Sequence, residues 1–313
     1  MFALENSSTN VELLQSINKA IIDSKQSSGL FKDFNSISVG ADEYSTKYPY
    51  LIVIPLEENL IRMFTNGYAD VKRTYQFTIR GMKPTQEASF GLVIGLSNNI
   101  KQFFSRKSIN KDWRLKALRN QKSIVFNVKI SDISYDDFVQ THEGVISQSK
   151  LTIEFYSQIK TDVIEPIATN ELFQTNLKEL TKIIYEILNN YKASLLSEVR
   201  TLKYGNIEPI SFYPAITIIP LRSDLISRFA GADSNVSSHS VYVLTDFNNI
   251  PKSIYNNMDI IHKVRDILFA NKYLFKRAYD YSLLSIKYGE SNLGDVNYFT
   301  SQLLVDSSSF EPI

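Results

Sequence analysis

The sequence predicts an α+β protein made of two tandem copies of one two-layer α/β sandwich, each with helices packed on one face of a sheet. The chain has 313 residues, which is long enough for two domains of roughly 150 residues each. A block of apolar residues recurs 165 positions further along the chain. Helix-type and strand-type hydrophobic patterns also follow one another in the same order in both halves. We therefore expect domains at 1–160 and 161–313, joined by a linker at about 161–170.

The composition favours a folded protein and excludes several classes of function. Hydrophobic residues make up 43% of the chain and charged residues 21%, as in an ordinary globular protein. The formal charge of +1 argues against whole-chain binding of nucleic acid or acidic membranes, which needs an excess of Lys and Arg. The absence of cysteine excludes disulfides, thiolate metal sites and a cysteine nucleophile. No apolar run approaches the roughly 18 residues of a membrane span, so we expect no membrane partner.

The internal repeat consists of three blocks in the same order. The first block pairs Tyr48, Pro49, Ile54, Pro55 and Leu56 with Tyr213, Pro214, Ile219, Pro220 and Leu221. The second, at the same spacing, pairs Leu60, Ile61 and Phe64 with Leu225, Ile226 and Phe229. The third lies upstream at a spacing of 166 and pairs Leu14, Ile17 and Ile21 with Leu180, Ile183 and Ile187. A slip of one residue across a loop is what a duplication produces, so the repeat predicts two domains of one fold.

The first copy begins with an amphipathic helix, because its apolar residues recur at helical spacing with polar residues between them. These residues are Val11, Leu14, Ile17, Ile21 and Ile22. After a polar loop, Tyr50–Ile54 is apolar on both faces, which predicts a central strand that ends at Pro55. Val71–Arg80 alternates, which predicts a half-buried strand. Its buried face holds Tyr75, Phe77 and Ile79, and its opposite face holds Thr74, Gln76 and Thr78.

The remaining elements complete the order helix, strand, strand, helix, strand, strand. Phe90–Phe104 is predicted to be the second helix, although Gly91 and Gly95 weaken it. Alternating strands are predicted at Ile124–Ile130 and Leu151–Tyr156. The second copy repeats the order with Leu177–Leu188 (helix), Ala215–Ile219 and Ser240–Leu244 (strands), Met258–Phe269 (helix), Ser282–Tyr288 and Phe299–Val305 (strands). The sheet of such a sandwich has one half-polar face and open edges, which each copy either shields or uses to assemble.

The sequence offers no constellation typical of an enzyme, a metal site or a cofactor site. The three histidines, His142, His239 and His262, share no metal-ligand spacing, so a solvated or hydrogen-bonded role is favoured for each. Glycine-rich phosphate loops and nucleophile elbows are absent. An acidic cluster lies in a predicted loop before the last strand of the first copy and contains Asp132, Asp136, Asp137 and Glu143. Its spacing does not match a calcium loop, so we favour a solvated hairpin over a cation site.

One segment concentrates positive charge around the single tryptophan, Trp113. It contains Lys101, Arg106, Lys107, Lys111, Arg114, Lys116, Arg119 and Lys122, with Asp112 as the only acid. Cations after a helix complement its C-terminal dipole, so a solvated loop is the first interpretation. The alternative is a basic surface that faces DNA in a channel or an acidic partner ring.

A second candidate surface is the apolar segment after the first predicted strand of each copy. In the first copy it holds Leu60, Ile61, Met63, Phe64 and Tyr68, and in the second Leu225, Ile226 and Phe229. We expect this segment to form a hairpin connection, and connections are usually polar and exposed. The segment therefore either folds back onto its own domain or packs against a neighbouring subunit as an interface.

The chain resembles the tail-terminator, or tail-completion, family of long-tailed bacteriophages. The resemblance covers Asn10–Tyr156 and Asn176–Val305 and rests on the order of elements and on Tyr48-Pro49 and Tyr213-Pro214 before β-branched strands. The duplication departs from the usual member of the family, which resembles one such domain per chain. The resemblance implies a structural virion protein that forms a ring on the tail tube, stops its growth and joins it to the neck or head connector.

The same resemblance implies partners and a location. They are other copies of the chain, the tail tube protein, and sheath, neck or connector proteins, with only non-specific contact to DNA. A hexameric ring of six chains is favoured over a pseudo-sixfold ring of three. The protein would lie in the virion tail or neck, and in the host cytoplasm during assembly.

Three other interpretations stay open. Within the structural class, the chain is another neck, collar or baseplate component with the same domain. The second is a nucleic-acid-binding module that uses the basic segment, but Tyr75 and Phe77 are predicted to face the core, which leaves no aromatic platform for bases. The third is an enzyme with a composite site between the domains, which a deep pocket lined by ionisable groups would indicate.

Overall fold

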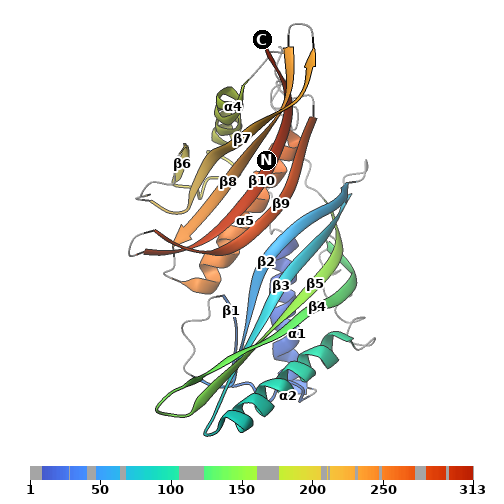
Figure 1. Cartoon of the computed structure of the whole chain (residues 1–313), viewed down its shortest axis with the longest axis vertical. Coiled ribbons are helices and arrows are strands. Elements are labelled where there is room, and N and C mark those ends of the chain that lie inside the picture. Colours follow the sequence, from blue (N-terminus) through green and yellow to red (C-terminus); the bar gives the residue numbers. More distant parts are fainter. Residues whose placement is uncertain are drawn as a thin grey trace. The chain divides into compact units, whose positions relative to one another are not determined.

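The chain has a mixed α+β fold in the computed structural model, as the sequence predicts (Figure 1). The structure describes residues 9–27, 29–40, 47–63, 68–105, 123–160, 176–205, 210, 212–229, 232–246, 249–271, 280–293 and 296–312. They divide into two compact units, one formed by Thr9–Lys160 and one by the described residues from Asn176 onward.

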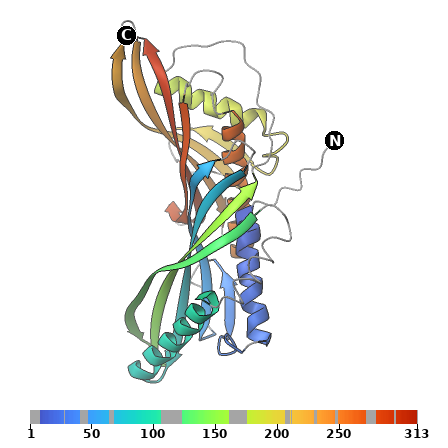
Figure 2. The same cartoon turned by 90° about the vertical axis from the view of Figure 1, so that its right-hand side faces the viewer.

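The first unit contains two described helices and a five-stranded sheet. Its elements are α1 (Thr9–Ser27), β1 (Ser36–Val39), β2 (Tyr50–Met63), β3 (Tyr68–Lys83), α2 (Gln86–Ser105), β4 (Ser123–Gln140) and β5 (Val145–Lys160). The strands lie in the order β4-β5-β3-β2-β1, and all neighbours are antiparallel except β1 and β2, which are parallel. Helix α2 packs on β3 and β5. In Figure 2 it lies against the lower part of this sheet.

The second unit has the same strand order and the same strand directions. Its elements are α4 (Leu177–Asn190), β6 (Thr201–Tyr204), β7 (Ala215–Phe229), β8 (Ala232–Asp246), α5 (Ile250–Ala270), β9 (Asp280–Leu293) and β10 (Val296–Pro312). The order is β9-β10-β8-β7-β6, with only β6 and β7 parallel. Helix α4 packs on β6 and β7, and α5 packs on β8, β9 and β10. The peptide bonds Tyr48–Pro49 and Tyr213–Pro214 are both cis.

The predicted order of elements was incomplete, because each unit has an additional short strand at the sheet edge. Strand β1 pairs with Tyr50–Val53 of β2, and β6 pairs with Ala215–Ile218 of β7. Each of these strands has only four residues, too few for a hydrophobic period to be recognised. Their extended conformation is therefore fixed by pairing with a neighbour instead of by their own pattern.

Helix α1 buries most of its predicted apolar stripe. In α1, Leu14, Ile17 and Ile21 are fully buried, but Ile22 is exposed, so its assignment to the stripe was wrong. The second-unit helices have defined N-terminal caps. The side chain of Asn176 accepts a hydrogen bond from the Glu179 N–H, and the side chain of Asn249 accepts one from the Lys252 N–H. Such caps satisfy backbone donors that the first turn leaves unpaired.

The core of the first unit is an aromatic cluster between α2 and the sheet. Tyr75, Phe77 and Ile79 are buried, which confirms the predicted inner face of β3. The ring of Phe104 in α2 lies edge to face against two other rings. Its centroid is 5.3 Å from that of Phe77 and 5.6 Å from that of Phe155. Thr74 and Thr78 on the opposite face are also buried. That face is therefore less accessible to solvent than the alternating pattern suggested.

Strands β2 and β7 do not end at their prolines, contrary to the prediction. Proline removes one ladder donor, but a β-bulge can accommodate it. The register with the neighbouring strand shifts between Pro55 and Glu57 in β2 and between Pro220 and Arg222 in β7. Both strands continue beyond the bulge, to Met63 and Phe229. The predicted hairpin connection is therefore mostly strand, and only its residues 64–67 lie outside the described part of the chain.

Candidate interaction surfaces

In each unit, the strand with the bulged proline and its neighbour continue beyond that proline, alongside a further strand of the same sheet. We call Glu57–Met63 with Tyr68–Thr74 the first ribbon, and Arg222–Phe229 with Ala232–Ser238 the second ribbon. A second register shift lies between Leu60 and Arg62 in the first ribbon and between Leu225 and Ser227 in the second. The bulges therefore occupy corresponding positions in the two units, and the extra residue is an isoleucine in both.

The bulge determines which apolar side chains are exposed. Ile61 and Ile226, the extra residues, are 54% and 59% exposed. Leu60 is half-buried and packs against Ala69 and Val71, so it folds back onto its own unit. Leu225 is exposed in the second ribbon. A bulge reverses the alternation of faces, which explains why neighbouring apolar residues have different environments.

The predicted interface set thus divides into three groups. Exposed members are Ile61, Leu225 and Ile226, and half-buried members are Leu60 and Tyr68. Phe64 and the side chains of Met63 and Phe229 lie outside the described residues. Leu221, the bulged residue after Pro220, is also exposed, although it was not predicted to be an interface residue. The repeat pairs Leu221 with Leu56, and this pairing was the sequence feature that could have identified it.

The inner faces of the two ribbons differ in chemistry. In the first ribbon, the buried guanidinium of Arg73 donates to the carboxylate of Glu58 at 2.7 Å and to the hydroxyl of Ser157 at 2.9 Å. In the second ribbon, the strand registers place Ser223 and Ser237 at the positions of Glu58 and Arg73. Their hydroxyl oxygens lie 3.2 Å apart. A buried ion pair thus links three strands in one unit, and serines occupy the same place in the other.

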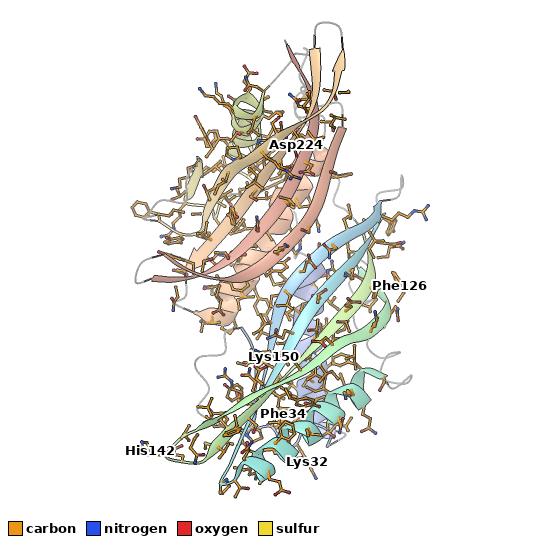
Figure 3. All side chains as sticks on the ribbon, viewed as in Figure 1. Lys32, Phe34, Phe126, His142, Lys150 and Asp224 are labelled. Atoms are coloured by element: carbon orange, nitrogen blue, oxygen red, sulfur yellow. The ribbon has the colours of Figure 1, made fainter. Side chains whose placement is uncertain are left out.

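Strand β4 forms a second exposed surface of the first unit. Within the described part of the chain it pairs on one side only, with β5. Phe126, Phe138 and Val139 are exposed on this edge strand, and Figure 3 shows Phe126 at the outer edge of the sheet. The ring of Tyr135 lies edge to face against Phe90 of α2 at 5.6 Å. An exposed edge strand with large apolar residues is a template for association with another chain.

Three of the four residues of the acidic cluster are not in a loop, contrary to the prediction, and only Glu143 lies in the turn between β4 and β5. Asp132, Asp136 and Asp137 belong to β4, because this strand extends to Gln140. The ammonium of Lys150 on β5 lies 2.6 Å from the Asp136 carboxylate, and its hydrogen bond, together with that of Gln148, lowers the pKa of Asp136. Among the described residues, no group of three or more potential ligands is placed to hold a metal ion.

The three histidines lie in separate environments. His142 is exposed at the turn between β4 and β5, where Figure 3 labels it. His262 lies in α5, and its Nε2 is 3.2 Å from the Tyr288 hydroxyl. His239 in β8 is fully buried, with Nε2 at 3.1 Å from the Thr181 hydroxyl. Burial lowers the pKa of His239 to about 4, so its imidazole is neutral at physiological pH.

Only the first residue of the basic segment lies on a described element. Lys101 is half-buried in the last turns of α2. The remaining residues, Arg106, Lys107, Lys111, Arg114, Lys116, Arg119 and Lys122, lie outside the described residues. No helix in the described part of the chain is both long and apolar enough to cross a membrane.

Comparison with known proteins adds no relative to this description. The chain matches no protein-family model, and no curated protein is significantly similar to it.

Proposed function

We propose that the chain is a structural protein of a bacteriophage tail, built from two tail-terminator-like copies, that forms a ring on the tail tube. The ring would end tube growth and join the tube to the neck or head connector. The observation that carries this proposal is the correspondence of the two units. They share strand order, strand direction and two bulges at matching positions of β2 and β7. This correspondence supports a tandem duplication, together with the sequence repeat.

The exposed surfaces support the proposal that copies of this chain associate with one another. Exposed apolar residues occur on the ribbons and on β4, at the rim of the sheets. Apolar groups concentrated at strand edges mark interfaces, because the unpaired backbone there can also form hydrogen bonds to another chain. A ring follows when one surface of a chain binds a different surface of the next and the rotation closes.

The burial of Tyr75 and Phe77 argues against the nucleic-acid alternative. Tyr75 and Phe77 are buried against α2 and β5, so this face of the sheet offers them to no base. A role for the basic segment is still testable by binding of DNA over a range of salt concentrations, with Arg114→Glu and Arg119→Glu. Loss of a steep salt dependence in these variants would favour that alternative.

The test of the proposal is electron microscopy of the purified chain in negative stain, alone and mixed with tail tubes. We expect rings, or rings at tube ends once tubes are added. Light scattering gives the mass of the ring and so separates three chains from six. A chain that stays monomeric at high concentration and does not bind tubes would contradict the proposal.

A further inference from the structure

Corresponding strand segments of the two units differ in exposure. In β2, residues 56–60 are buried or half-buried, whereas the corresponding residues 221–225 of β7 are all exposed. The edge of β7 is also unpaired beyond Ile218 within the described residues, because β6 covers only Ala215–Ile218. Strand β7 therefore presents a free edge with Leu221, Leu225 and Ile226 exposed on it.

At the other end of the strand order, one pair of corresponding tyrosines differs in exposure. Tyr135 in β4 is paired with Ser149, and Tyr288 in β9 is paired with Ser301, at corresponding positions of the two sheets. Tyr135 is 38% exposed, but Tyr288 is only 8% exposed. Strand β4 thus exposes a large aromatic residue where β9 buries one, although Lys287 and Glu290 of β9 are also exposed. One chain carries exposed apolar residues on two different edge strands, β4 and β7.

We propose that the free edge of β7 in one chain pairs with the free edge of β4 in a second copy of this chain. This inference rests on the proposed ring and names the surfaces that build it. Contact between two different edges is heterologous, so every chain added leaves one β4 edge and one β7 edge at the ends of the assembly. Such a contact repeats until the rotation closes a ring.

The bulges restrict where the two edges pair. In β7, the bulges after Pro220 and Leu225 leave Arg222–Leu225 as a regular stretch of strand. In β4, the register shifts between Ile130 and Asp132 and between Asp136 and Val139, which leaves Asp132–Asp136 as a regular stretch. Bulges often protect an edge from pairing over its full length. Two short regular stretches of similar length instead allow pairing in one place, with apolar residues on both sides of it.

Each stretch carries a charged group that the other can pair with, although Asp136 already lies 2.6 Å from the Lys150 ammonium. The described part of the β4 stretch presents the carboxylates of Asp132 and Asp136. The β7 stretch presents Arg222, whose side chain is 70% exposed and whose partner Asp224 is 55% exposed. An exposed ion pair of this kind contributes little stability, so Arg222 can exchange its partner for a carboxylate of β4. Apolar contact of Tyr135 with Leu225 or Ile226 would surround this polar centre.

Cross-linking tests the inference, because the natural chain has no cysteine. Ser134→Cys on β4 and Ser223→Cys on β7 are made in separate chains with tags of different size, mixed, and treated with a flexible bis-maleimide. We expect the mixed S134C–S223C product to dominate over either homodimer, and the double variant to give a ladder that ends at the ring. Ser194→Cys, exposed in the turn after α4, is the control and should give no specific product. Homodimers alone, or no product above this control, would overturn the inference.

A matched pair of isoleucines provides the second measurement. Ile226→Lys and Ile61→Lys change the same residue type at corresponding bulges with similar exposure. We expect I226K to reduce the S134C–S223C product at least tenfold and I61K to leave it unchanged, with circular dichroism confirming that both are folded. Equal effects of the two variants would overturn the edge assignment. Rings on tubes that persist in I226K would refute this inference but not the proposed function, whereas a chain that neither associates nor binds tubes would refute both.

Discussion

His239 should make the second unit less stable at acidic pH. Its ring is buried, its Nε2 lies 3.1 Å from the Thr181 hydroxyl and 3.4 Å from the Leu177 carbonyl oxygen, and its Nδ1 has no hydrogen-bond partner among the described residues. Burial disfavours the charged imidazolium and lowers the pKa to about 4, although the Leu177 carbonyl and the charge of Asp306 act in the opposite direction. In the unfolded chain the same histidine titrates near its ordinary pKa of about 6.5.

The sign and the size of the effect follow from this difference in pKa. Between about pH 6.5 and pH 4 the unfolded chain binds a proton that the folded chain does not bind, so the free energy of unfolding falls as the pH falls. The contribution of His239 is complete above about pH 6.5 and is lost progressively down to about pH 4. A shift of about 2.5 units corresponds to roughly 3 kcal/mol in total, of which about 2 kcal/mol is lost by pH 5.

The measurement needs to report on β8 itself, because two-domain proteins often do not unfold in one step. Hydrogen exchange of β8 peptides, followed by mass spectrometry, gives the free energy of the opening that exposes this strand. We expect the difference between about pH 7.5 and pH 5 to be about 2 kcal/mol smaller in His239→Gln than in the natural chain, since glutamine does not titrate. His142→Gln, at an exposed turn, should behave as the natural chain. An unchanged pH dependence in H239Q would refute the reasoning.

Three further substitutions have expected outcomes that calorimetry or denaturant unfolding can check. Arg73→Met leaves the Glu58 carboxylate buried without its guanidinium, so we expect a loss of about 3–5 kcal/mol, most of which the double variant Glu58→Gln/Arg73→Met restores. A double variant as unstable as the single one would contradict this. Gly144→Ala should destabilise the β4–β5 turn by more than about 1 kcal/mol, because φ is +150° and a Cβ would lie 2.7 Å from the Lys83 carbonyl oxygen. A Cβ added at Gly91 in α2 meets no atom within 4 Å, so Gly91→Ala should raise the free energy of unfolding by about 0.5–1 kcal/mol. Equal effects of the two glycine variants on stability would show that backbone geometry does not determine these effects.

The sequence predicted the elements whose hydrophobic period is uninterrupted. Tyr75, Phe77 and Ile79 alternate over a regular stretch of β3, and their burial follows from that alternation alone. The extensions of β2 and β7 beyond their prolines were not predictable in this way. The polar residues Glu57–Asn59 follow Pro55, and their strand conformation depends on pairing with β3. The short strand β1 depends on its neighbour in the same manner.

The candidate surface was predicted as a segment but not residue by residue. The sequence marks Leu60 and Ile61 equally, since both are apolar and both recur in the second copy. The structure separates them, because the bulge places Leu60 on the inner face with Val71 and turns Ile61 outward. A register shift of one residue exchanges the two faces of a strand. The position of the bulge depends on how β2 pairs with β3. The sequence of β2 alone therefore does not determine it.

The two ribbons share their bulge geometry but differ in the chemistry of their inner faces. The bulges that turn Ile61 and Ile226 outward are the same in both units, so the backbone path does not depend on the residues beneath it. Beneath the first ribbon, Arg73 and Glu58 form a buried pair, and such a pair tolerates the loss of neither partner. The hydroxyls of Ser223 and Ser237 replace it in the second ribbon and impose no charge requirement. The second ribbon therefore combines an exposed apolar and charged edge with an inner face that holds no buried charge at this position, whereas the inner face of the first ribbon holds a buried ion pair.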